Sequence, residues 1–187
     1  MLRWVEDQTD EICIEAIKNS EEAVHLIRHL PFERCLKFLE YRGEILKYIP
    51  GNLQTEDICL KALNENPSTL QYVKIPQTPE FLIKAVRDNW KVIKHIKNRF
   101  ITDEVCLVAI EQEPMAIKHI RNPSEDVCLE VVTRNPKTLN YIRNPSKEVC
   151  QKAVNRSWKI LRDFKKENTE KELKAINKMI WKFLDSK

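Results

Sequence analysis

The sequence contains only two glycines, Gly43 and Gly51, and no Cys-x-x-Cys pair. Glycine-rich loops that cradle phosphates and the glycine fingerprints of dinucleotide sites are therefore excluded, and a clustered thiolate zinc site lacks its usual spacing. No apolar run approaches the roughly 20 residues of a membrane-spanning helix. Residues 1–8 are charged and hold no apolar stretch, so we expect no secretory signal, no membrane contact and a cytoplasmic location.

The patterns of common catalytic sites are also missing. No Ser-His-Asp order and no nucleophile elbow is present. His25 and His29 have the i, i+4 spacing of a helical metal pair, but no third ligand accompanies them, whereas catalytic zinc usually has three protein ligands. A solvated helix face is the favoured interpretation of this pair. We expect no catalytic residue, no metal site and no cofactor, and hence a protein that is not an enzyme.

What the sequence does contain is one register repeated seven times around a cysteine or leucine anchor. The steps between anchors are 22, 24, 23, 24, 22 and 22 residues. A fixed period in this range is typical of repeat proteins, in which candidate sites are columns of equivalent positions. The anchors are Cys13, Cys35, Cys59, Leu82, Cys106, Cys128 and Cys150.

Each repeat begins with the signals of a helix start. Four residues before the anchor the sequence has a hydroxyl residue in six repeats and Pro31 in the other, and two residues before the anchor it is always acidic. Hydroxyl caps and first-turn carboxylates satisfy or complement the free N–H groups of a helix. Apolar residues around the anchor, such as Ile58 and Leu63, predict a first helix that is buried over most of its surface.

A second, shorter helix is predicted in the same repeat. Pairs such as Asn66-Pro67 and Asn135-Pro136 place proline just inside a helix. Eleven residues after the anchor the sequence is always aliphatic, and the next buried position follows three residues later. Buried members of this stripe include Leu139, whose truncation to alanine is expected to cost stability.

These patterns together predict an all-α fold, an α-solenoid of about seven short helical hairpins with a C-terminal capping helix. We expect a single domain over residues 1–187. Residues 1–8 would form an N-terminal cap, 9–166 the seven repeats, and 167–187 the capping helix, which starts with a capping box at Thr169 and Glu172.

The six cysteines are interpreted as small buried apolar residues. All six occupy the anchor position, and packed helices lie about 8–10 Å apart, while a disulfide needs Cα atoms within roughly 7 Å. We therefore expect no disulfide and no thiolate metal site.

Two columns of the second helix concentrate the surface chemistry, one of rings and one of cations. A basic residue in a last helical turn also complements the helix dipole, and a ring at the edge of a stripe also packs on its neighbours, so both interpretations stay open. Tyrosine and arginine are enriched in binding hot spots, which favours partner contact. The predicted contact residues are Tyr72, Lys94, His95, Lys97, Lys118, His119, Arg121, Tyr141, Arg143 and Lys165.

Charge is uneven along the chain. Residues 136–187 hold 14 Lys or Arg and 6 Asp or Glu, a net charge of +8, whereas the whole chain carries +4. Such asymmetry can mark contact with nucleic acid or an acidic protein. Trp90 and Trp158 share the register position eight residues after the anchor, where we favour a local plug over an exposed contact residue.

The repeat resembles a known short two-helix repeat of unassigned function found in tailed phages, giant viruses and host-associated bacteria. The resemblance spans roughly residues 9–166, with the best matches at Asn135 to Val154 and Glu113 to Val132. It implies the helical fold and an intracellular interaction protein, and it carries no catalytic residue.

The leading functional prediction is a non-enzymatic module that binds a protein with an acidic surface. If it is encoded by a phage or virus, it would inhibit or modulate a host defence protein in the host cytoplasm. Two alternatives remain: nucleic-acid backbone binding along the basic column, and capture of a small anionic nucleotide between rings and cations.

Overall fold

The computed structural model describes residues 2–28 and 31–164. These residues form helices and loops and contain no strand, so the all-α prediction is confirmed for them. The chain divides into two compact units, Met1–Gln112 and Glu113–Lys187. Each unit is described by itself, and within the described residues no helix has the length and apolar character needed to cross a membrane.

The first unit alternates α-helices with short 3₁₀ helices. Its α-helices are α1 (Asp10–Asn19), α2 (Phe32–Leu39), α3 (Glu56–Glu65), α4 (Pro79–Asp88) and α5 (Asp103–Gln112). Its 3₁₀ helices are η1 (Leu2–Trp4), η2 (Glu21–Leu26), η3 (Gly43–Tyr48), η4 (Gly51–Leu53), η5 (Pro67–Tyr72), η6 (Trp90–Lys94) and η7 (Asn98–Phe100).

The second unit follows the same alternation and ends on a longer helix. Its elements are η8 (Pro114–His119), α6 (Glu125–Arg134), η9 (Pro136–Tyr141) and α7 (Lys147–Phe164). In this unit α6 packs against α7 and η9, and η8 packs against η9.

The helix starts lie where the sequence predicts them. In six repeats the hydroxyl four residues before the anchor accepts a hydrogen bond from the backbone N–H three residues later, as Thr55 does from Ile58 and Ser124 does from Val127. The same cap is made by Thr9, Thr78, Thr102 and Ser146. Pro31 precedes α2 without a side-chain cap, because proline has no hydroxyl to accept the bond.

The second helices are of the 3₁₀ type. Four of them begin at a side chain that accepts from the backbone N–H two residues on, as Asn66 does from Ser68 and Asn135 does from Lys137. This bond closes a tight turn at the start of a 3₁₀ helix of five or six residues. In the first six repeats the residues ten and eleven after the anchor are buried, for example Thr69 and Leu70.

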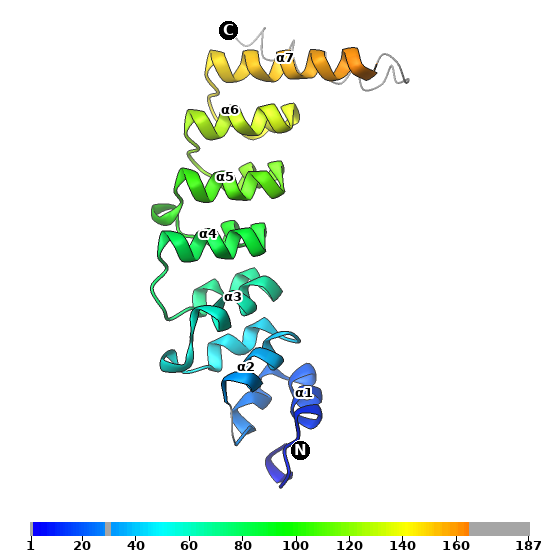
Figure 1. Cartoon of the computed structure of the whole chain (residues 1–187), viewed down its shortest axis with the longest axis vertical. Helices are drawn as coiled ribbons and strands as arrows, with labels where there is room; N and C mark the ends of the chain where they lie inside the picture. Colours follow the sequence, from blue (N-terminus) through cyan, green and yellow to red (C-terminus); the bar gives the residue numbers. More distant parts are fainter. Residues whose placement is uncertain (1, 29–30, 165–187) are drawn as a thin grey trace. The chain divides into compact units, whose positions relative to one another are not determined.

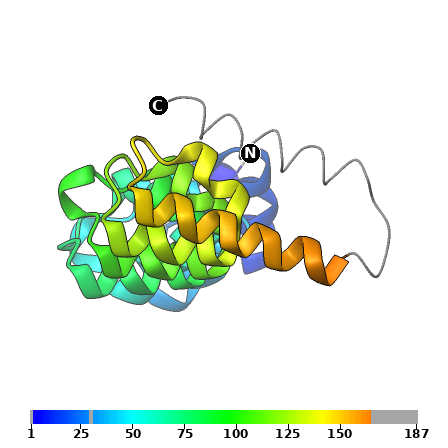
Figure 2. The same ribbon diagram turned by 90° about the horizontal axis from the view of Figure 1, so that it is seen from above.

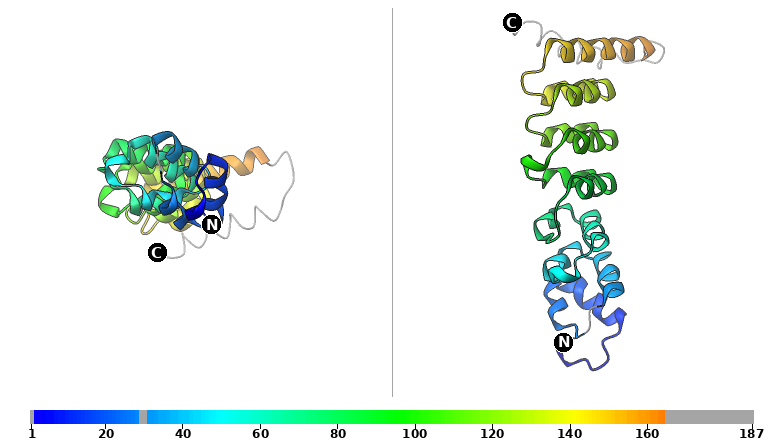
Figure 3. Two further views of the ribbon diagram at one scale, coloured as in Figure 1. Left: turned by 90° about the horizontal axis from the view of Figure 1, so that it is seen from below. Right: turned by 60° about the vertical axis from the view of Figure 1, so that its left-hand side comes forward.

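The first unit is built as two layers. Its α-helices contact one another in chain order from α1 to α5, and η2, η3, η5 and η6 likewise contact one another in order. Figures 1 and 3 both show α4 and α5 lying side by side in this way. Ion pairs join successive α-helices: Asp10 with Arg34 at 2.7 Å, Glu40 with Lys61 at 2.7 Å, and Glu56 with Lys84 at 2.7 Å.

The anchors lie in the core, as predicted. Cys13, Cys35, Cys59, Leu82, Cys106 and Cys128 are buried, Cys150 is half-buried, and all six cysteines are free. The first helices are less covered than the sequence suggests, however. Ile12 and Leu107 are 40% and 38% exposed, because they lie at the edge of the apolar stripe.

Burial makes the anchor thiols inert. It raises the pKa of Cys59 and Cys106 to about 12, and the thiolate is the reactive form. With iodoacetamide at pH 8, we expect Cys150 to be alkylated first and Cys59 and Cys106 to react only on unfolding. Mass spectrometry of timed samples measures this, and labelling in guanidinium, where all six should react alike, is the control. Native labelling of Cys59 as fast as that of Cys150 would contradict the assigned burial.

The seventh repeat does not form the predicted hairpin within the described residues. Helix α7 runs without interruption from Lys147 to Phe164, as Figure 2 shows, through the position where the other repeats break. Ser157 donates a hydrogen bond to the Ala153 carbonyl at 2.8 Å and so adds no turn. Trp158 is 53% exposed, so the plug predicted there is wrong. The predicted capping helix at 167–187 lies outside the described residues.

Candidate functional site

The predicted contact residues are mostly on the surface. Lys94, His95, Lys97, Lys118, His119, Arg121, Tyr141 and Arg143 are exposed, Tyr72 is half-buried, and Lys165 lies outside the described residues. The first unit contains Tyr72, Lys94, His95 and Lys97, and the second unit contains the five residues from Lys118 to Arg143.

In the first unit, rings and cations of the second helices do come into contact. The ring of His25 meets that of Tyr48 edge to face, with centroids 4.4 Å apart, and the Lys47 ammonium lies 4.5 Å from the Tyr48 ring centroid. Both contacts are of the kind that aromatic quadrupoles favour. The contact joins His25, twelve residues after its anchor, to Tyr48, thirteen residues after the next anchor.

In the repeat anchored at Leu82, the cation and the ring of the second helix lie farther apart. The Lys94 ammonium lies 5.1 Å from the Trp90 ring, so Trp90, which is half-buried, packs locally as predicted. Partial burial, together with the charge of Lys94, lowers the pKa of His95 below its ordinary value. The shift favours the neutral ring, so we expect the positive charge there to come chiefly from Lys94 and Lys97.

In the second unit, Lys118 and Tyr141 form one contact pair. The Lys118 ammonium lies 4.4 Å from the Tyr141 ring centroid, and the ring stays 44% exposed. The two residues are 23 positions apart, the same separation as His25 and Tyr48. The contact between second helices therefore recurs in both units.

Three cations among the predicted contact residues make neither an ion pair nor a ring contact with the described residues. These are Lys97 in the first unit and Arg121 and Arg143 in the second; all three are exposed. A guanidinium in this state can accept a carboxylate in bidentate geometry without first breaking an internal bond. Arg121 follows Lys118 by three residues, and Arg143 follows Tyr141 by two.

Sequence reasoning missed a column of glutamines five residues before the anchor. Gln54 is buried, and its Nε2 donates to the carbonyls of Leu46 at 3.2 Å, Ile49 at 3.1 Å and Tyr72 at 3.2 Å. Its Oε1 accepts from the Lys74 backbone N–H at 2.8 Å. One carboxamide thus ties η5 to the end of the preceding repeat.

The same bonds recur at Gln8. Its Nε2 donates to the Leu26 carbonyl at 2.9 Å, and its Oε1 accepts from the Arg28 N–H at 2.9 Å. Gln77 donates to the Leu70 carbonyl at 3.4 Å. The sequence did carry a signal, because the dipeptide Gln-Thr occurs three times at this register: Gln8-Thr9, Gln54-Thr55 and Gln77-Thr78.

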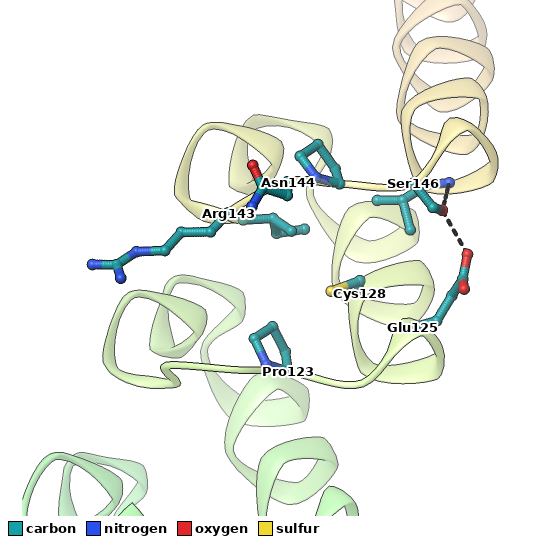
Figure 4. Close-up of a pocket in the computed structure, with 9 residues that line it drawn as sticks. Pro123, Glu125, Cys128, Arg143, Asn144 and Ser146 are labelled. Atoms are coloured by element: carbon teal, nitrogen blue, oxygen red, sulfur yellow. Dashed lines mark hydrogen bonds between the residues drawn. The ribbon is translucent and has the colours of Figure 1, made fainter.

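A small cavity of about 150 Å³ lies in the second unit (Figure 4). Its walls come from the loop before α6, from α6 itself, and from the loop that joins η9 to α7. On one side Ser146 donates to the Glu125 carboxylate at 2.5 Å, and the Arg143 side chain extends away from that pair. Asn144, with φ of 51°, turns the chain at this wall, a conformation that asparagine tolerates better than most residues.

Among the residues that the structure describes, no cluster of three or more His, Cys, Asp or Glu side chains could hold a metal ion. Comparison of the chain with protein-family models, with curated proteins and with solved structures finds no match.

Proposed function

We propose that this chain is a non-enzymatic helical-repeat module, an α-solenoid of short two-helix repeats that binds a protein with an acidic surface. The recurring caps, anchors and 3₁₀ second helices support the repeat. The resemblance to repeats of phages and giant viruses extends the proposal to a virus-encoded protein that inhibits or modulates a host defence protein in the host cytoplasm.

The observation that carries the proposal is the surface formed in the second unit by Lys118, Arg121, Tyr141 and Arg143. It offers an exposed tyrosine ring already held by a lysine, together with two exposed arginines that have no internal ion pair. Tyrosine loses little rotamer freedom on binding, and tyrosine and arginine are both enriched in hot spots. Complementary charge on a partner would speed its association and select it over neutral surfaces.

Charge reversal of this surface tests the proposal. In Lys118→Glu/Arg121→Glu we expect partner binding to fall by at least a hundredfold, because two attractive contacts become repulsive and close charge pairs across an interface couple by about 1.5–7 kcal/mol. Tagged protein purified from its native host, followed by quantitative mass spectrometry, measures the loss of the co-purifying protein. Circular dichroism should show unchanged helicity.

Lys137→Glu/Lys152→Glu is the matched control. It reverses two other exposed lysines of the same unit and changes the net charge equally. The partner should be retained by this variant. Equal recovery with the Lys118/Arg121 variant, or no stoichiometric protein with the wild type, would count against the proposal.

Nucleic-acid binding is the competing outcome of this experiment. Phosphate contacts would make affinity fall steeply with salt, and a mobility-shift titration of duplex DNA at two salt concentrations measures it. A net charge of only +4, with exposed carboxylates such as Asp126 and Glu148 at the first-helix starts, is modest for a protein that binds a phosphate backbone.

A further inference from the structure

Two repeats of the first unit use a carboxamide in the same way. In the repeats anchored at Cys13 and Cys59, a glutamine side chain bridges the carbonyl 13 residues after the anchor and the N–H 15 residues after it. In the second of these repeats the anchor thiol also contacts the amide, with Cys59 Sγ 3.8 Å from Gln54 Oε1. Each amide therefore accepts from one backbone N–H and donates to at least one carbonyl, and the Gln54 amide also contacts a thiol.

The repeat anchored at Cys128 has the same backbone positions but not the glutamine. Pro123 stands where Gln8 and Gln54 stand, and proline has no side-chain donor or acceptor. The equivalent groups are the Tyr141 carbonyl, the Arg143 N–H and the Cys128 thiol, and none has a hydrogen-bond partner among the described residues. The 150 Å³ cavity lies next to these groups (Figure 4). Pro123, Cys128, Ile142 and Arg143 line it, and the Tyr141 carbonyl is on the peptide group that joins Tyr141 to the lining residue Ile142.

We propose that this cavity is a binding site for a primary carboxamide, supplied by a glutamine or asparagine side chain of the partner protein. The incoming amide would take the place that the repeat's own glutamine fills in the first unit. Its NH₂ group would donate to the Tyr141 carbonyl, and its oxygen would accept from the Arg143 N–H.

The hydrogen-bonding groups select the amide over charged ligands. A carboxylate cannot donate to the Tyr141 carbonyl, and an ammonium group cannot accept from the Arg143 N–H. The Glu125 carboxylate, which lines the cavity, also disfavours an anion. A primary amide carries a donor and an acceptor side by side, so one group satisfies both backbone positions.

The size of the cavity and its surroundings point to a protein source. Sites for small-molecule ligands usually span about 300–1,000 Å³, whereas this cavity of about 150 Å³ suits a single side chain. Tyr141 and Arg143 also belong to the surface on which the proposed function rests, so the source of the amide, though not the site, depends on that proposal.

Amide titration of the wild-type protein tests the site. In ¹H–¹⁵N NMR spectra, butyramide should shift the Arg143 N–H resonance saturably. N,N-dimethylbutyramide, which has no donor, and butyrate should not. The absence of a saturable shift with butyramide, or an equal shift with the dimethyl compound, would overturn the site.

A blocked Ala-Gln-Ala peptide with a methylated terminal amide tests the source. It should reproduce the butyramide shift, and the matched Ala-Met-Ala peptide should not. Binding of butyramide without binding of the glutamine peptide would overturn the protein source, while the co-purification experiment would decide the proposed function separately.

Filling the cavity from within provides a second test. Pro123→Gln should remove the response to butyramide, slow hydrogen exchange at Arg143 and raise the melting temperature, because the repeat would regain its own carboxamide. Pro123→Met, of similar size but without the amide, should not slow exchange at Arg143. Full butyramide response in Pro123→Gln would contradict the assignment.

Discussion

Replacement of Gln54 by leucine is expected to destabilise the protein by about 2–5 kcal/mol, since a buried backbone group left without a partner costs about 1–3 kcal/mol. The carboxamide of Gln54 binds the carbonyls of Ile49 and Tyr72 and the N–H of Lys74. Leucine fills a similar volume but removes the partner of the Tyr72 carbonyl and of the Lys74 N–H, while the Ile49 carbonyl keeps its bond from the Lys74 ammonium at 3.0 Å. Urea denaturation followed by circular dichroism measures the change.

Two further variants sharpen this experiment. Gln71→Leu alters an exposed glutamine with one local bond, and its effect should stay within about 0.5 kcal/mol. Gln54→Glu should also be destabilised and should regain stability as the pH falls, because only the protonated carboxyl can donate to a carbonyl. An unchanged midpoint in Gln54→Leu would show that the carboxamide bonds add nothing to stability.

Truncation of Leu139 to alanine is the second large effect, with an expected cost of about 2–5 kcal/mol from lost burial and the cavity left behind. Leu139 is 3% exposed and lies in η9, the element that packs against both α6 and α7. Loss of its side chain therefore loosens both contacts of this helix. Denaturant unfolding monitored by tryptophan fluorescence, with Trp158 in the same unit, measures it.

Leu53→Ala serves as the control for this variant. Leu53 is 43% exposed, so its truncation should change the unfolding free energy by less than about 0.5 kcal/mol. Equal costs at Leu139 and Leu53 would contradict the assignment of the η9 stripe to the core.

Local features were predictable from sequence because their partners lie a few residues away. Thr55 caps the N–H of Ile58 three positions on, and Asn135 caps that of Lys137 two positions on. Residue spacing alone places such pairs. The buried anchors follow from the same periodicity, as the burial of Cys59 and Cys128 bears out.

We predicted a second helix in the seventh repeat from its register alone, whereas the structure continues α7 through that position. Trp90 and Trp158 share one position, but Asn89 precedes the first and caps η6, whereas Ser157 precedes the second. Asn89 accepts from the Lys91 N–H and closes a turn. Ser157 instead donates back to Ala153 and leaves the helical ladder intact. The tryptophan at this position therefore does not decide whether the helix breaks, and neither does a side-chain cap alone, since η2 and η3 begin after Ser20 and Arg42 without one.

The all-helical fold, the helix starts and the core columns follow from residue order, since each depends on neighbours along the chain. The hydrogen bonds of Gln54 do not, because its partners Tyr72 and Lys74 are 18 and 20 residues away and reach it only in the packed repeat. The Gln-Thr dipeptide recurs at this register, but residue order does not say which backbone groups the amide binds. Only the packed structure brings donor and acceptor together.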